Sequence, residues 1–258
     1  MIVSRRDRRA HFLIAIMSDL DLLLLQAAEA VSNRNDSVGV LVYGSYASGR
    51  WDPDSDLDLI CVTRSSQPKQ FRLLVNGREV DVYANSRVQI TKIFYSDFGD
   101  NNNFVLQAFV RGRPVIDPEG EVQELIREAH RIWEQGPPNP SPEGRQKIAA
   151  CARVMLGVSG RLAARATRSP QWREMVEVLS GRFFLDCFYH YCRVHRLWSS
   201  AMWDMLVWTD PGYEELLTIT REYLNDPSLE NRLRAIGQLA EATIMSCQSS
   251  REPVSRSA

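Results

Sequence analysis

Three aspartates stand where they could bind a divalent cation together. Asp56 and Asp58 begin an apolar run, and Asp81 lies between Val80 and Val82 in a second such run. Alternate side chains of a strand share one face, so Asp56 and Asp58 would point together. Carboxylates held side by side repel each other unless a cation joins them, and such oxygen ligands suit Mg²⁺. The spacing predicts a magnesium site.

A Gly-Ser pair offers a candidate binding site for phosphate. Gly44 and Ser45 follow an apolar run at 38–43 and precede a short predicted helix near 46–50. A turn that leads from a strand into a helix presents free backbone N–H groups to an anion. Arg50 stands just after this turn, where it could neutralise phosphate charge; a solvated loop arginine explains it equally well. A cation site beside such a turn is the apparatus of phosphoryl or nucleotidyl transfer.

A predicted hairpin would bring the third aspartate to the other two. Asn76-Gly77 separates two strand-like runs, and this dipeptide is the strongest short-range hairpin signal because both residues tolerate positive φ. The second arm carries Asp81. If it returns beside the strand at 56–62, three carboxylates are available for two metal ions.

Each of these features has a simpler explanation when taken alone. An amphipathic edge strand also exposes alternate polar side chains, which would account for Asp56 and Asp58. Ser45 could be an ordinary helix N-cap. The combination favours function, because clustered carboxylates repel each other.

Gly44-Ser45, Asp56-Leu57-Asp58 and Val80-Asp81-Val82 occur in this order within about residues 38–84. Together they resemble the DNA polymerase β nucleotidyltransferase superfamily. The pattern is similar in particular to small-molecule nucleotidyltransferases such as the aminoglycoside adenylyltransferases, and to the minimal nucleotidyltransferases found beside toxin genes. The hairpin aspartate makes the match specific, because Gly-Ser with Asp-x-Asp alone occurs by chance.

The resemblance implies roles for the three aspartates. The reaction would move a nucleoside monophosphate, AMP from ATP, onto a hydroxyl group, with two Mg²⁺ ions as cofactors. Asp56 and Asp58 would bridge both ions. Asp81 would complete the shell of the ion that activates the acceptor, and either it or a base from elsewhere in the chain would take the proton.

The resemblance also implies how the triphosphate is held. Gly44 and Ser45 would bind its β- and γ-phosphates, and Arg50 would neutralise its charge. Lys147, near the start of a later predicted helix, is a weaker candidate, because a cation at that position is otherwise ordinary surface.

Bulk composition favours a small substrate. The 258 residues include 31 basic and 32 acidic ones, so no overall field attracts a nucleic-acid polymer, which is not expected as a partner. The five cysteines are odd in number and scattered, which indicates free thiols in the cytoplasm. No apolar run approaches the length of a membrane span. Basic residues and a short apolar run at 1–17 resemble a signal peptide only faintly. We interpret them as a solvated leader, with Met17 as an alternative start.

The sequence predicts an α+β head followed by a helical bundle. The head, residues 18–103, would hold a helix at 20–31 with Ser18 as its N-cap, strands at 38–43 and 56–62, the hairpin, and a helix at 88–95. This order indicates a mixed β-sheet with helices on one side. Connecting helices are expected at 104–135, with helical segments at 104–111 and 119–133.

A Pro-rich stretch at 136–142 indicates a linker. Beyond it, residues 143–247 carry apolar residues at helical spacing and predict a bundle. Its helices are expected at about 143–167, 170–195, 198–208, 211–225 and 228–247. The polar tail at 248–258 is expected to be disordered.

Cys187, His190, Cys192 and His195 have metal-ligand types at zinc-like intervals. On one helix these side chains spread around more than half the circumference and cannot converge on one ion. A core helix is the better interpretation. Asp186 and His190 are i,i+4 neighbours that could orient a general base, but a buried, hydrogen-bonded histidine explains the pair more simply.

Two functions compete, while the presence of all three carboxylates argues against a third, a non-catalytic binding module that keeps the fold. The first is nucleotidyl transfer to a hydroxyl of a small molecule, such as an aminoglycoside-like antibiotic, which would make this a resistance enzyme. Such an acceptor is cationic, and acidic residues of the predicted bundle could receive it: Glu174, Glu177, Asp186 and Asp204. The second is an antitoxin-type nucleotidyltransferase that acts on or binds a protein or RNA partner. It ranks lower because those proteins are little more than the head. The sequence leaves the acceptor, the preferred nucleotide, the general base and the oligomeric state open.

Overall fold

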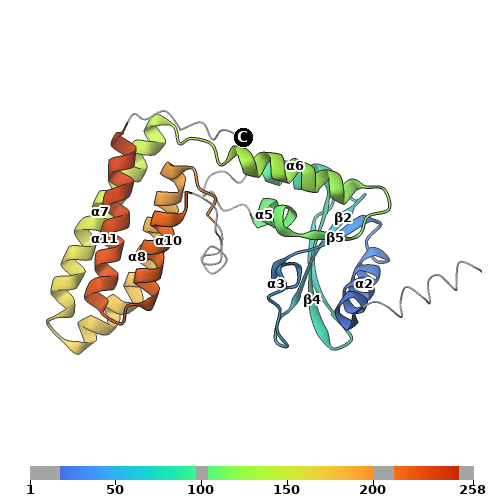
Figure 1. Ribbon diagram of the computed structural model, residues 1–258, viewed down its shortest axis with the longest axis horizontal. Coiled ribbons are helices and arrows are strands. Elements are labelled where there is room, and N and C mark those ends of the chain that lie inside the picture. The colour runs from blue at the N-terminus through green and yellow to red at the C-terminus, as the bar shows by residue number, and fades with distance from the viewer. Residues whose placement is uncertain (1–17, 97–103, 200–211, 250–258) are drawn as a thin grey trace, which may run out of the picture. The chain divides into compact units, whose positions relative to one another are not determined.

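The computed structural model describes residues 18–96, 104–199 and 212–249 (Figure 1). Within these ranges, residues 18–96 and 104–135 form one compact unit, and the residues from 136 onward form a second. We call them the sheet unit and the bundle unit. The predicted leader at 1–17, nearly all of the predicted helix at 198–208 and nearly all of the tail lie outside the described residues.

The sheet unit is built on five strands in the order β3-β4-β2-β1-β5. Strand β2 runs parallel to β4, and the other neighbouring pairs are antiparallel, so the sheet is mixed, as predicted. The strands are β1 (Ser37–Val42), β2 (Leu57–Thr63), β3 (Lys69–Val75), β4 (Arg78–Ser86) and β5 (Arg113–Ile116).

The predicted hairpin joins β3 to β4. Its two turn residues, Asn76 and Gly77, have φ angles of 51° and 77°. Two consecutive positive φ values match the twist of antiparallel strands and bring Val75 opposite Arg78. The turn therefore sets the register that places Asp81 on the sheet.

Helices cover both faces of the sheet, and the expectation of one side was wrong. Helix α2 (Asp19–Ser32), capped by Ser18 as predicted, packs on the face formed by Leu57, Leu59 and Val82. Helix α6 (Glu121–Gln135) covers the opposite face, where a Cβ on Gly39 would collide with Val122. A strand covered on both sides is a continuous apolar run, and β1 has this pattern, with residues 38–42 all buried.

Three shorter helices complete the unit: α3 (Gly44–Ser48), α4 (Arg87–Ser96) and α5 (Phe104–Arg111). The region expected to hold only connecting helices also contributes strand β5, which pairs Pro114 with Leu41 of β1. The sequence-based prediction missed β5 because a four-residue segment that contains a proline resembles a loop between helices. Proline is accepted in an edge strand, and β5 is one.

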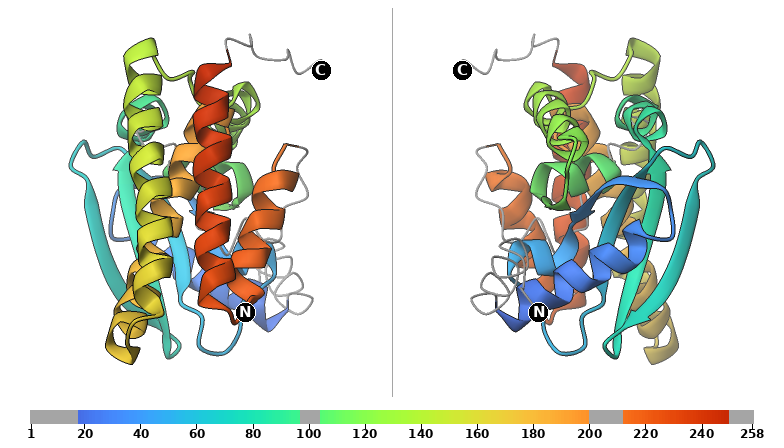
Figure 2. Two further views of the ribbon diagram at one scale, coloured as in Figure 1. Left: turned by 90° about the vertical axis from the view of Figure 1, so that its left-hand side faces the viewer. Right: turned by 90° about the vertical axis from the view of Figure 1, so that its right-hand side faces the viewer.

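The bundle unit contains long helices that run side by side (Figure 2). They are α7 (Pro142–Ala166), α8 (Pro170–His195), α10 (Glu214–Asn225) and α11 (Leu229–Gln248). Serine hydroxyls of Ser141, Ser169 and Ser228 cap α7, α8 and α11. In the core, the rings of Phe184 and Tyr223 stack with centroids 4.0 Å apart. The helical region after the sheet unit is therefore as predicted in kind.

Among the described helices, none combines the length and apolar character needed to cross a bilayer. The cysteines are free thiols, and three of them, Cys61, Cys187 and Cys192, are buried.

Candidate active site

The three aspartates meet on the face of the sheet opposite α2. Asp58 of β2 and Asp81 of β4 are direct partners in the parallel register, and Asp56 immediately precedes β2. One carboxylate oxygen from each lies within 4.8 Å of those of the other two. Within the described ranges, no other group of three or more histidine, cysteine or acidic side chains is close enough to share a metal ion.

The electrostatics of this triad favour a bound cation. Burial raises the pKa of the Asp58 carboxyl to about 7, and repulsion from Asp56 and Asp81 adds to the rise. The protein itself therefore leaves negative charge on Asp58 poorly compensated. Oxygen ligands of this kind are those that Mg²⁺ takes from proteins, usually together with substrate phosphates. A divalent cation would neutralise the repulsion.

Gly44 lies against the triad because of its backbone conformation. Its φ of 68° is in the left-handed region, and a Cβ there would collide with the Oδ2 of Asp58. The backbone N–H of Tyr43 also donates to the carbonyl oxygen of Asp58 at 3.1 Å. The turn at Gly44 and Ser45 is thus held directly beside Asp58, as the sequence suggested. Binding of phosphates by these two residues stays a prediction.

The two predicted phosphate-binding cations have different surroundings. Arg50 follows α3, and its Nε donates to the Ser48 hydroxyl at 3.1 Å, so it stays near the Gly-Ser turn. Lys147 belongs to α7 of the bundle unit, where its exposed Nζ lies 2.7 Å from Glu143. Neither role is tested by these contacts.

The structure adds two residues to the site that the sequence reading missed. The side chain of Tyr43 faces the triad: burial raises the pKa of its hydroxyl well above 10, and Asp58 and Asp81 raise it further. This hydroxyl therefore stays protonated and can act as a donor. Arg72 of β3 pairs with Asp81 through its Nε and one terminal nitrogen of its guanidinium group. Tyr43 could have been suspected from its place next to Gly44, but nothing local marks Arg72.

Aromatic rings extend the same face of the sheet. Tyr83, two residues after Asp81 on β4, meets Phe104 of α5 edge to face, with ring centroids 5.6 Å apart. The ring centroid of Tyr43 lies 6.5 Å from that of Phe104. Phe104 remains 47% exposed. An aromatic surface next to the triad is a suitable stacking platform for a flat ring.

The loop before Asp56 uses the carboxylate of Asp52 for its own hydrogen bonds. The Asp52 carboxylate accepts from the Asp54 N–H at 2.9 Å and from the Ser55 hydroxyl at 3.0 Å. Arg78 donates to the carbonyl oxygens of Pro53 and Ser55. Asp52 is therefore occupied in shaping the loop.

The cysteine–histidine series on α8 is part of the helical core, as preferred from the sequence. Cys187 and Cys192 are buried, and His195 instead approaches the Ser246 hydroxyl at 2.9 Å. The expectation of a hydrogen-bonded His190 was wrong: its buried Nδ1 has no partner, and burial lowers its pKa. Asp186 pairs with Arg182, so it does not orient His190.

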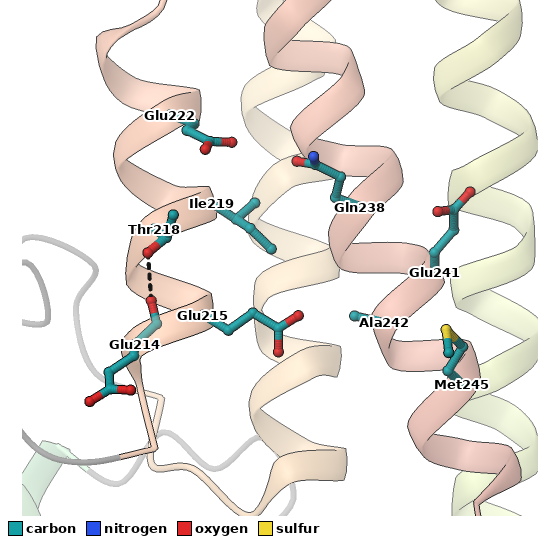
Figure 3. Close-up of a pocket in the computed structure, with 9 residues that line it drawn as sticks. All are labelled: Glu214, Glu215, Thr218, Ile219, Glu222, Gln238, Glu241, Ala242 and Met245. Atoms are coloured by element: carbon teal, nitrogen blue, oxygen red, sulfur yellow. Dashed lines mark hydrogen bonds between the residues drawn. The ribbon is translucent and has the colours of Figure 1, made fainter.

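An acidic groove of about 570 Å³ lies within the bundle unit between α10 and α11 (Figure 3). Glu214, Glu215 and Glu222 of α10 line it together with Glu241 of α11. Glu174, Glu177 and Asp186, which the sequence suggested, do not line this groove, and Asp204 is outside the described residues. Glu177 approaches Arg173 and Arg232, and Asp186 pairs with Arg182.

Comparison with protein families decides what kind of domain carries the triad. Residues 24–110, which include β1 to β4 and all three aspartates, match the family described as nucleotidyltransferase domain. The chain contains a nucleotidyltransferase domain. Its fold and its acidic triad are those expected of an enzyme of this type. The nucleotidyltransferase domain implies a nucleoside triphosphate substrate and a divalent metal.

Further comparisons add little to this assignment. A solved nucleotidyltransferase-like protein from Exiguobacterium sibiricum matches at 10% sequence identity, covering 86% of this chain and 75% of that chain. The TM-score is 0.43, which is too low to extend the assignment beyond the nucleotidyltransferase domain. No curated protein matches the chain.

Proposed function

We propose that this protein transfers AMP from ATP to a hydroxyl of a small molecule, using two Mg²⁺ ions. The single observation that supports this is the meeting of Asp56, Asp58 and Asp81, with one oxygen of each within 4.8 Å of the others. Two cations at such a site can stabilise both the attacking and the leaving oxygen of an in-line displacement.

Each residue then has a defined task. Asp56, Asp58 and Asp81 would hold the divalent ions, which would stabilise charge on the reacting oxygens. The backbone at Gly44 and the Ser45 hydroxyl hold the terminal phosphates of the donor, and Arg50 neutralises their charge. The protonated Tyr43 hydroxyl can donate to a substrate oxygen. The general base is Asp81 or a group that the triad does not include.

The acceptor is proposed to be a small polyhydroxylated molecule. The near balance of 31 basic and 32 acidic residues gives no broad positive field for nucleic acid. The resemblance to small-molecule nucleotidyltransferases makes a hydroxylated amine of the aminoglycoside type the first acceptor to test. An acidic surface suits a cation, and the groove between α10 and α11 offers one within the bundle unit.

A labelling experiment tests the proposal. The full chain is incubated with Mg²⁺ and each of the four α-labelled ribonucleoside triphosphates, and with a panel of aminoglycosides, other hydroxylated small molecules, RNA and cell proteins. We expect label from ATP on a small molecule. Label confined to RNA or to a protein would contradict the small-molecule acceptor, and absence of label throughout would contradict transferase activity.

Asp58→Asn should reduce labelling about a thousandfold or more, because several kcal/mol of transition-state stabilisation depend on the metal site. Asp54→Asn is the matched control, since Asp54 is an exposed loop aspartate outside the triad. Thermal unfolding of both variants checks that the fold persists. Full activity of Asp58→Asn would refute the metal assignment.

A further inference from the structure

The Asp81 carboxylate already forms an ion pair within the protein, with the guanidinium group of Arg72. The Nε of Arg72 lies 2.5 Å from Oδ1 of Asp81, and one terminal nitrogen donates to Oδ2 at 2.8 Å. The two residues face each other in the antiparallel register of β3 and β4, so this contact is built into the sheet. A two-pronged contact of this type is among the stronger charge-assisted interactions, and it uses a lone pair on each carboxylate oxygen.

Glu79 provides a second carboxylate close to Arg72. Glu79 is two residues before Asp81 on β4 and therefore projects from the same face. Its carboxylate lies 3.4 Å from the other terminal nitrogen of Arg72. The side chains of Arg72 and Glu79 are 65% and 64% exposed, whereas that of Asp81 is only 24% exposed. The guanidinium can move toward Glu79 through solvent, without rearranging the core.

We propose that Arg72 is a resident counter-ion of Asp81. Arg72 competes with the divalent cation for this carboxylate and shifts toward Glu79 when Asp81 ligates metal. This inference depends on the proposed metal site. Arg72 then weakens metal binding in the free protein and keeps the triad partly neutralised when no metal is bound. Arg72 is a positioning residue that acts through Asp81.

Titration of the full-length protein with Mn²⁺, followed by calorimetry and by water-proton relaxation, tests this without measuring activity. Arg72→Gln should bind Mn²⁺ about tenfold more tightly, a change of about 1.4 kcal/mol. Arg72→Lys keeps the charge but lacks the planar fork, so its affinity should fall between those of wild type and Arg72→Gln. Glu79→Gln removes the alternative partner and should weaken binding.

Arg64→Gln is the matched control. Arg64 also bridges two carboxylates, Asp36 and Glu119, but it follows Thr63 at the opposite end of β2 from Asp58, so its loss should leave Mn²⁺ affinity unchanged. Unchanged or weaker Mn²⁺ binding by Arg72→Gln would overturn the inference; weaker binding would show that Arg72 orients Asp81 for the metal.

Asp58→Asn separates the two levels of the argument. Suppose that the wild type binds Mn²⁺, that Asp58→Asn abolishes this binding and that Arg72→Gln does not change it. This result would overturn the counter-ion role of Arg72 and leave the proposed function standing. Absence of Mn²⁺ binding by the wild type would overturn both.

Discussion

At the scale of single residues, Asp58 carries most of the electrostatic strain of the site. It is half-buried, it lies beside Asp81 on the neighbouring strand, and the Asp56 carboxylate is also close to it. The ionised form of Asp58 is therefore disfavoured in the metal-free fold. Asp81 differs because Arg72 already compensates its charge. Two neighbouring carboxylates of the same triad thus have opposite surroundings.

This contrast predicts how stability depends on pH when metal is removed. The pKa of Asp58 rises from 3.8 to about 7 on folding, so the folded state binds more protons than the unfolded state between these values. The contribution of Asp58 to stability is fully present below pH 3.8 and is lost as the pH rises through about 7. In a chelator, Asp58→Asn should therefore be more stable than wild type at pH 8, with the gap closing toward pH 4. Denaturant unfolding across this range measures it; a gap independent of pH would contradict the assignment.

At the scale of secondary-structure elements, the site depends on how β1, β2 and β4 meet. The parallel pairing of β2 with β4 brings Asp58 beside Asp81, and the turn after β1 carries Gly44 against Asp58. The hairpin turn sets the register of β3 on β4, which brings Arg72 opposite Asp81. The site therefore forms only when these separate elements pack together in the sheet.

Gly44→Ala tests the close approach of the turn. An alanine at a φ of 68° is strained, and its Cβ would push the Asp58 carboxylate out of the triad. We expect a stability loss of about 1–2 kcal/mol from the left-handed backbone. We also expect a loss of Mn²⁺ affinity that is larger than in the control variant. Gly120→Ala is the control: its φ of 77° is similarly strained, but its Cβ would meet open space, and Gly120 lies outside the hairpin that places Asp81. Equal Mn²⁺ affinity in the two variants would show that Gly44 does not matter to the triad.

At the scale of the whole molecule, the described chain has two compact units with separate cores. All three aspartates, Gly44 and Arg72 belong to the sheet unit. The bundle unit has its own aromatic core around Phe184 and Tyr223 and its own acidic groove. Metal binding should therefore act directly on the stability of the sheet unit alone.

Calorimetry of the full chain with increasing Mn²⁺ measures this effect. A ligand that binds only the folded state stabilises it by about 2.7 kcal/mol when present at 100 times its dissociation constant. We expect the transition that unfolds the sheet to move to higher temperature and to return when a chelator is added. Asp58→Asn should show no such shift. An equal shift in that variant would mean that Mn²⁺ binds somewhere other than the triad.

The sequence by itself determined the features that depend on local chemistry. Asn76-Gly77 required positive φ and produced the hairpin, alternation placed Leu57 and Leu59 in the core, and Ser18 capped its helix. The three candidate aspartates followed from such local signals, and the nucleotidyltransferase domain followed from the family resemblance of the motifs that carry them. Only the tertiary structure decided the partners of those residues. Arg72 opposite Asp81, Tyr43 facing the triad, β5 beside β1 and the second helical layer all arise from contacts between distant segments. The physical reason is that strand periodicity specifies which face a side chain occupies, whereas register and packing between strands specify what it meets there.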